Sequence, residues 1–74
     1  KHELASDADR AALQAVVATA QSKAKAAYTA ASYADLETEL AESMELLSRD
    51  TLYKAAALEQ VTHLTDAVQN LKAA

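Results

Sequence analysis

The sequence predicts an all-α protein, an antiparallel up-down-up bundle of three helices. Glycine and proline, the two residues that most often interrupt regular backbone, are both absent from its 74 residues. Alanine, the strongest helix former, fills 20 positions. Three stretches repeat apolar side chains at steps of three and four residues, which is the spacing of one helix face. We therefore expect one domain over residues 1–74, with helices at about 6–27, 30–48 and 51–72 joined by short turns.

The first expected helix begins at Ser6. A serine hydroxyl is a preferred N-cap, and Asp7 and Asp9 place negative charge in the first turn, where the helix dipole favours it. Lys23 and Lys25 suit the opposite end for the same reason. The apolar face of this helix consists of Leu13, Val16, Val17, Ala20, Ala24 and Ala27.

The second expected helix has the best-defined start in the chain. With Thr29 as N-cap, its hydroxyl accepts from the backbone N–H of Ser32, and Ser32 reaches back toward the N–H of Thr29 as a weaker form of capping box. Tyr28 and Tyr33 then occupy the two positions of a hydrophobic staple, which sets the angle at which the chain enters the helix. The apolar stripe consists of Tyr33, Leu36, Leu40, Met44 and Leu47.

The third expected helix has an open start, because Ser48, Asp50 and Thr51 are each suitable N-caps. Its apolar stripe consists of Ala57, Val61, Leu64, Val68 and Leu71, widened by Leu58. A single long helix that pairs with other chains is the alternative fold, since heptads persist here for about three repeats. The staple around Tyr28 and Thr29 argues against it, because such a string is out of place inside a helix.

The charge balance excludes some classes of protein. Eleven acidic and seven basic side chains give a formal charge of −4. A nucleic-acid-binding protein needs a basic surface, and so does a helix that lies on an anionic membrane. No apolar run approaches the ~20 residues that span a bilayer, so we expect no membrane insertion. The chain has no cysteine and opens with Lys1, and we expect a monomeric segment of a larger protein.

Three strings of residues carry a resemblance to a known family. An L-x-x-V-V-x-x-A string begins at Leu13. The string Y-T-x-x-S-Y begins at Tyr28 and leads into a leucine ladder at Leu36 and Leu40. An L-x-x-A-V-x-x-L string begins at Leu64. In this order, and over nearly the whole chain, they resemble the FIVAR module ("found in various architectures").

The resemblance implies a setting more than a chemistry. Similar modules occur in large secreted or wall-attached bacterial proteins, beside glycoside hydrolase, carbohydrate-binding and adhesin domains, sometimes in tandem. It implies a spacer or interaction module at the cell surface, whose partners are the neighbouring domains of the same polypeptide, with a glycan or a host surface protein as the alternative partner. No catalytic residue belongs to the family pattern. At Tyr53 and Lys54 the chain departs from the family, which often has threonine followed by acidic residues there.

Tyr53 is the candidate for ligand contact. Aromatic faces stack on sugar rings, which would suit a glycan, although near a helix start we expect the ring to cover the end of the bundle. The third helix also has an uncharged polar flank, which is suited to hydrogen bonding with a glycan but is otherwise ordinary surface. This flank consists of Thr62, Thr65, Gln69 and Asn70.

We expect no metal or other cofactor. His63 lies near Glu59 and Asp66, but its heptad position points it to solvent, and no second histidine is placed to help. The second helix carries an acidic run that could attract a basic partner or Ca²⁺. Calcium prefers oxygens that converge on one point, and a helix surface spreads them, so we expect a solvated face opposite basic residues of neighbouring helices. The run consists of Asp35, Glu37, Glu39, Glu42 and Glu45.

The residues give no support for catalysis. No serine is placed with a histidine and an acid as in a triad, no buried carboxylate pair is indicated, and there is no glycine for a phosphate-binding loop. We therefore expect a protein that is not an enzyme. Its first expected role is a structural spacer in a secreted or cell-surface protein, accessory to a carbohydrate-active enzyme or an adhesin. A glycan- or host-protein-binding module is the second hypothesis, and a cytosolic helical interaction domain is the third.

Overall fold

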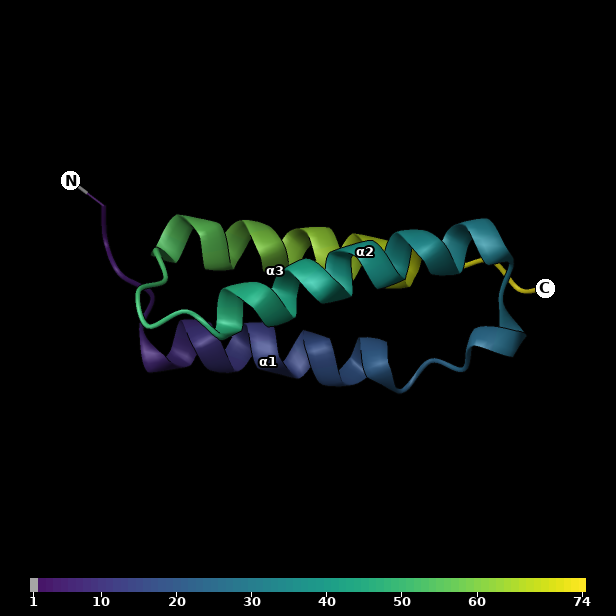
Figure 1. Cartoon of the computed structure of the whole chain (residues 1–74), viewed down its shortest axis with the longest axis horizontal. Coiled ribbons are helices and arrows are strands. Elements are labelled where there is room, and N and C mark those ends of the chain that lie inside the picture. Colours follow the sequence, from purple (N-terminus) through teal and green to yellow (C-terminus); the bar gives the residue numbers. More distant parts are fainter. Residues whose placement is uncertain (1) are drawn as a thin grey trace.

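The protein is a bundle of three antiparallel helices, as the sequence predicts. The computed structural model describes residues 2–74. Its helices are α1 (Asp7–Gln21), α2 (Ala30–Leu47) and α3 (Lys54–Gln69), with a short 3₁₀ helix η1 (Lys25–Ala27) between the first two. Each long helix packs against both others, in a rod of 44 × 18 × 16 Å (Figure 1). The alternative of one continuous helix is wrong.

Helix α1 begins as predicted and ends six residues early. The N–H of Asp9 donates to Oγ of Ser6 at 3.1 Å, and the N–H of Ser6 donates to Oδ2 of Asp9 at 2.9 Å, which completes a capping box. At the other end the hydroxyl of Ser22 donates to the Thr19 carbonyl at 2.6 Å, and Ala24 is extended. A helix through residue 27 would leave too little chain to reverse direction before α2, so Ala24 and Ala27 lie exposed in the connection.

Helix α2 begins where the sequence places it. Thr29 accepts from the N–H of Ser32 at 3.4 Å, and the stacked rings of Tyr28 and Tyr33 have centroids 6.5 Å apart, so the N-cap and the staple are confirmed. The predicted return contact from Ser32 is wrong. Its hydroxyl donates to the Thr29 carbonyl and accepts from the N–H of Lys72, while the N–H of Thr29 donates to the Lys72 carbonyl at 2.8 Å.

Helix α3 is shorter than predicted at both ends. Its N-cap is Tyr53, which makes no capping hydrogen bond with its side chain, so none of the three predicted caps is used; Ser48 instead ends α2. The residues before α3 cross the end of the bundle and bury Leu52, which is 2 % exposed. Burial of this leucine decides where the helix can begin, and a local capping rule does not contain that information.

The core forms two apolar clusters along the rod. One lies toward Tyr28 and consists of Val17, Ala20, Leu36, Leu64 and Ala67. The other lies toward Tyr53 and consists of Leu13, Leu46, Leu52 and Ala57. Among the buried residues are also Ser43 and Gln60, whose side chains bond to each other at 2.9 Å. Met44 and Leu58, expected inside, are 50 % and 46 % exposed.

The position of Met44 follows from helix geometry. A helix has 3.6 residues per turn, so a stripe that leaves Leu40 can continue through either Ser43 or Met44. The apolar residue is the natural prediction, but the fold turns Ser43 inward, where its side chain bonds to that of Gln60. Gln60 lies next to Val61 of the predicted stripe in the same way, whereas Leu58 lies two positions from Gln60.

Short antiparallel bridges hold the two chain segments that flank the bundle. Leu4 faces Tyr53, with hydrogen bonds from Ala5 N–H to the Leu52 carbonyl and from Lys54 N–H to the Glu3 carbonyl, each 2.8 Å. At the opposite end Tyr28 faces Ala73. We name these ends of the rod the Tyr53 end and the Tyr28 end (Figure 1). In the described part of the chain, no helix has both the length and the apolar character needed to cross a membrane.

Candidate functional site

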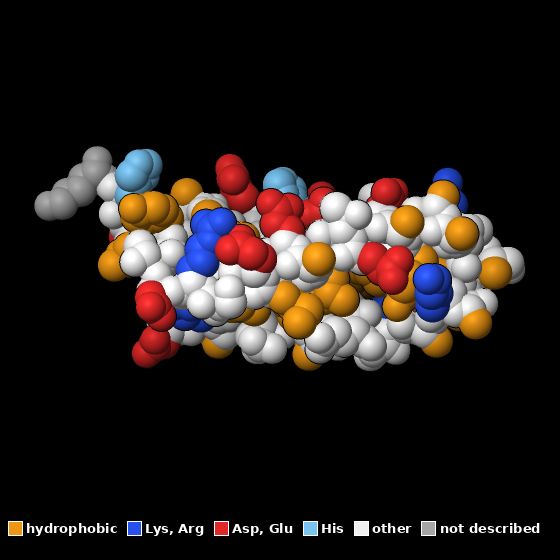
Figure 2. Space-filling view, viewed as in Figure 1, with side chains coloured by type: hydrophobic (Ala, Val, Ile, Leu, Met, Phe, Trp, Pro, Cys, Tyr) orange, Lys and Arg blue, Asp and Glu red, His pale blue; other side chains and the backbone are white. Residues whose placement is uncertain are grey.

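The surface around Tyr53 is the candidate site that the structure supports most directly. Tyr53 is extended, with φ −81° and ψ 143°, and is 45 % exposed beside the bridge to Leu4. The centroids of the His2 and Tyr53 rings lie 5.0 Å apart, and the planes of the two rings are tilted by 42°. An open hollow of about 330 Å³ adjoins the ring, and it is lined by His2, Glu3, Tyr53, Lys54, Ala55 and Leu58. Figure 2 shows hydrophobic side chains gathered beside a histidine at this end.

Tyr53 does less to close the bundle than we expected. Leu52 lies under the end of the bundle and is buried, whereas almost half of Tyr53 faces solvent. Sequence reasoning missed Leu52 because it lies outside every apolar stripe. The aromatic ring is therefore available to a ligand or a partner.

One ion pair fixes the charge beside this ring. Nζ of Lys54 lies 3.0 Å from Oδ2 of Asp9. The pKa of Asp9 is lowered from 3.8, first by the hydrogen bond from the Ser6 backbone and then by the bond from Lys54. The same bond raises the pKa of Lys54 above 10.5. Lys54 is thus occupied within the bundle, and Glu3 is the charged group that faces the hollow without an ion pair among residues 2–74.

Arg10 is a positioning residue that sequence reasoning missed. Its guanidinium donates to the carbonyl of Arg49 at 2.9 Å, of Asp50 at 3.3 Å and of Leu47 at 3.5 Å. It therefore satisfies the carbonyl of the last residue of α2 and two carbonyls beyond it, and holds the connection that leads to Tyr53. The sequence does contain a signal for this role. Arg10 lies three residues before the buried Leu13, which places it on the inner face of α1.

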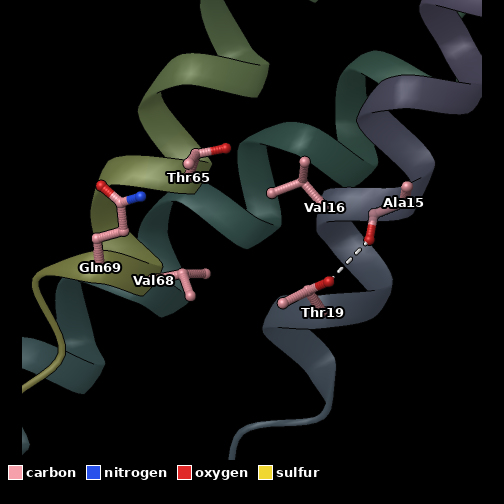
Figure 3. A pocket seen from close by; sticks show the side chains of 6 residues that line it. All are labelled: Ala15, Val16, Thr19, Thr65, Val68 and Gln69. Atoms are coloured by element: carbon pink, nitrogen blue, oxygen red, sulfur yellow. Dashed lines mark hydrogen bonds between the residues drawn. The ribbon is translucent and has the colours of Figure 1, made fainter.

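A second hollow, the α1–α3 groove, is apolar at its centre and has a volume of about 300 Å³. Val16 from α1 and Val68 from α3 reach into it from its two sides (Figure 3). The hydroxyl of Thr19 donates to the Ala15 carbonyl at 3.2 Å and is thus used within its own helix. The lining residues are Ala15, Val16, Thr19, Thr65, Val68 and Gln69.

The structure separates the uncharged flank of α3 from Tyr53. Thr65 and Gln69 border the α1–α3 groove, and the hydroxyl of Thr62 donates to the Leu58 carbonyl of its own helix at 3.4 Å. Asn70 borders a different hollow, with residues of α2. Twelve residues of helix rise about 18 Å, so Tyr53 and Thr65 do not share one ligand site.

Four of the five carboxylates in the acidic run of α2 are exposed, and the fifth, that of Glu39, is half-buried and accepts from Gln60. Glu45 pairs with Arg49 at 2.8 Å, four residues further along the chain. Within residues 2–74 neither ion pair joins α2 to another helix, so the expected basic neighbours make no ion pair with this face. His63 is exposed, as predicted. In that same range no three histidine, cysteine or carboxylate side chains are placed to hold a metal ion.

These features define a small all-α protein, a three-helix bundle with open hollows on its surface. Comparison with family models, with curated protein sequences and with solved structures finds no match to this chain. The resemblance to the FIVAR module therefore stays a prediction that depends on the strings that begin at Leu13, Tyr28 and Leu64.

Proposed function

We propose that the chain is a non-catalytic spacer module that holds the neighbouring domains of a longer polypeptide apart. The carrying observation is the position of its two flanking segments. The segment that enters α1 is tied to Tyr53, and the segment that leaves α3 is tied to Tyr28, at opposite ends of a rod 44 Å long. Domains joined to these segments would be separated by the length of the rod.

The likeness to the FIVAR module supplies the proposed setting. It supports a secreted or cell-surface bacterial protein, in which the module is accessory to a carbohydrate-active enzyme or an adhesin. Mutual packing of all three helices supports the stiffness that a spacer needs. The two bridges support a defined direction of the chain at each end.

Stiffness is the property that tests a spacer. A flexible Gly/Ser linker of equal residue count has a root-mean-square span of roughly 45–50 Å, so mean separation alone does not discriminate. We would join the module between two folded domains, each with one spin label, and measure the distribution of label distances by pulsed electron resonance. A spacer gives a narrow distribution, and the linker gives a broad one.

A variant of the same length provides the control. Leu64 is fully buried, so Leu64→Asp places a charge in the core and should unfold the module. Its distance distribution should then broaden to that of the linker. A native module whose distribution is already as broad as the linker's would overturn the proposal.

Glycan binding is the second candidate, favoured by the exposed Tyr53 ring beside an open hollow. Titration against a panel of bacterial and host glycans would show saturable binding that is lost in Tyr53→Ala. Met44→Ala is the matched control, because Met44 is equally exposed and lies on α2 away from that hollow. A pure spacer shows no saturable binding to any member of the panel.

A further inference from the structure

We propose that the two ends of the bundle bind each other, so that the Tyr53 end of one copy of this chain docks on the Tyr28 end of a second copy. The inference rests on how apolar and charged side chains divide between the ends. It does not depend on the proposed spacer function.

The Tyr53 end presents an apolar patch. Four large hydrophobic residues are exposed in the described part of the chain, and three of them are here: Leu4 at 57 %, Tyr53 at 45 % and Leu58 at 46 %. Leu4 and Tyr53 face each other across their bridge, and Tyr53 and Leu58 line one hollow. In a protein with so few large apolar residues, such a concentration at one end indicates a contact surface.

The Tyr53 end also carries an excess of negative charge, with five carboxylates and three basic side chains at residues 2–10 and 45–54. The basic side chains of this end are already engaged: Arg10 by backbone carbonyls, Arg49 by Glu45 and Lys54 by Asp9. Three carboxylates make no ion pair within residues 2–74. They are those of Glu3, Asp7 and Asp50.

The Tyr28 end has the opposite character. Residues 21–35 and 70–74 contain three lysines and one acidic side chain, that of Asp35, which lines a hollow with Lys72. None of the three amines makes an ion pair in the part of the chain that the structure describes. Small apolar surface lies among them, at Ala24, Ala26, Ala27 and Ala73, all exposed. The lysines are Lys23, Lys25 and Lys72.

Helix dipoles oppose this arrangement but are too weak to reverse it. The Tyr53 end collects two helix N-termini and one C-terminus, which leaves about half a positive charge there, and the Tyr28 end keeps about half a negative one. The side chains supply five carboxylates against three basic groups at residues 2–10 and 45–54, and three lysines against one carboxylate at the other end, residues 21–35 and 70–74. Their charges therefore decide the sign at both ends.

The same charges disfavour other ways for two copies to meet. Side-by-side contact through α2 would bring two exposed acidic faces together, in a chain with a net charge of −4. End-to-end contact instead places lysines against free carboxylates. It also lets a lysine amine lie over the exposed Tyr53 ring, an attractive cation–π geometry. Because the two surfaces differ, the contact is heterologous and adds copies in an open row.

Sedimentation of the chain tests the proposal. We would use the 74-residue chain with its terminal amine acetylated and its terminal carboxyl amidated, so that only side-chain charges act at the ends. At low salt the average mass should rise with protein concentration and pass the mass of a dimer. In about 0.5 M salt the association constant should fall by roughly tenfold, because exposed charges are screened. A mass that stays at one chain at all concentrations, or stops at two, would overturn the proposal.

Charge reversal separates a specific contact from a general effect of net charge. Lys25→Glu/Lys72→Glu and Glu3→Lys/Asp50→Lys should each abolish association, and an equimolar mixture of the two variants should restore it. Glu37→Lys/Glu42→Lys carries the same net charge as Glu3→Lys/Asp50→Lys but changes α2, so it should associate like the native chain. Association lost in this α2 variant, or absent from the mixture, would contradict the end-to-end contact.

The apolar patch has its own matched pair. Tyr53→Ser/Leu58→Ser should weaken association by at least tenfold, and Met44→Ser should leave it unchanged, since Met44 is the one exposed large hydrophobe described outside the patch. Circular dichroism of each variant verifies that the helices remain. Equal association in both variants would exclude the patch from the contact.

Discussion

Individual leucines differ in what they contribute, although the sequence places them in one stripe. Leu36 is 1 % exposed and belongs to the cluster toward Tyr28, whereas Leu40 packs against that cluster from its edge. Met44, from the same expected stripe, faces solvent. The three residues therefore form a graded series from core to surface along one helix.

This series predicts three different stabilities. Leu36→Ala should lower the free energy of unfolding by about 2–5 kcal/mol, as removal of buried methyl groups does in well-packed cores. Leu40→Ala should cost less, and Met44→Ala should change stability by under about 0.5 kcal/mol. Urea unfolding followed by circular dichroism measures all three. Equal losses at Leu36 and Met44 would mean that α2 is rotated from the orientation described.

The buried polar pair of Ser43 and Gln60 joins the residue scale to the pairing of α2 with α3. Nε2 of Gln60 donates to Oγ of Ser43 at 2.9 Å and to both the carbonyl and the carboxylate of Glu39, at 3.0 and 3.1 Å. Ser43 in turn donates to the Glu39 carbonyl at 2.7 Å. No buried side-chain polar atom of the described residues lacks a partner, so the network is complete.

Breaking this network on one side should cost more than removing it. Gln60→Ala leaves a cavity and a Ser43 hydroxyl without its donor, for a loss of about 1–3 kcal/mol. Ser43→Ala/Gln60→Leu replaces both partners with apolar groups and should recover most of that loss, because no polar atom then stays unsatisfied. A double-mutant cycle of Ser43→Ala and Gln60→Leu, with both single variants and the double variant unfolded in urea, gives the coupling. Additive losses would show that the two side chains act independently.

At the scale of elements, what the sequence predicts depends on whether a boundary is local. The start of α2 is set by Thr29, Ser32 and two tyrosines that are neighbours in sequence, and it was predicted to the residue. The two ends of α3 depend on residues far along the chain. Leu52 must reach the core before the helix starts, and the segment after the helix pairs with Tyr28, so propensity alone extends α3 three residues too far at each end.

The candidate site follows the same rule. Tyr53 was identified from its residue type and its place near a helix start. Its exposure, the nearby His2 ring and the engagement of Lys54 by Asp9 depend on a contact between segments about 50 residues apart. No periodic pattern encodes that contact, so the ring was predictable and its surroundings were not.

The start of α1 should make stability depend on pH. Asp9 has a lowered pKa in the folded state, so its contribution is present above the ordinary value of 3.8 and disappears as the pH falls through the lower folded value. Asp9→Asn keeps a side-chain acceptor for Ser6 but removes the charge that Lys54 contacts. The melting temperature of this variant should therefore lie below that of the native chain at about pH 6, and the gap should narrow as the pH falls below 3.8.

Asp7→Asn is the control for this experiment. It removes a charge from the same turn without touching Lys54 or the capping box. A gap that is equally large in Asp7→Asn would assign the effect to the helix dipole. A gap in Asp9→Asn that does not narrow as the pH falls below 3.8 would contradict the role of the charged carboxylate.

The whole molecule is a rod whose flanking segments are fixed by main-chain hydrogen bonds at both ends. In each bridge the central residues, such as Ala73, form no ladder bond, and the bonds come from the residues beside them. The N–H of Ala74 donates to the Ala27 carbonyl at 3.0 Å, and that of Ala5 donates to the Leu52 carbonyl at 2.8 Å. This pattern distinguishes positions that need an N–H from positions that do not.

Proline substitution uses that distinction to test whether the ends are held as described. Ala5→Pro and Ala74→Pro each remove one bridge donor, for an expected loss of roughly 0.5–1.5 kcal/mol. Ala73→Pro removes an N–H with no partner in its bridge and should cost little.

Hydrogen exchange at the remaining bridge amides, those of Lys54 and Thr29, measures the opening of each end separately. Ala5→Pro should speed exchange at Lys54 alone and Ala74→Pro at Thr29 alone, because the bridges lie at opposite ends of a rod 44 Å long. Faster exchange at both ends from either substitution would mean that the bundle opens as one unit and that the bridges do not hold their segments independently.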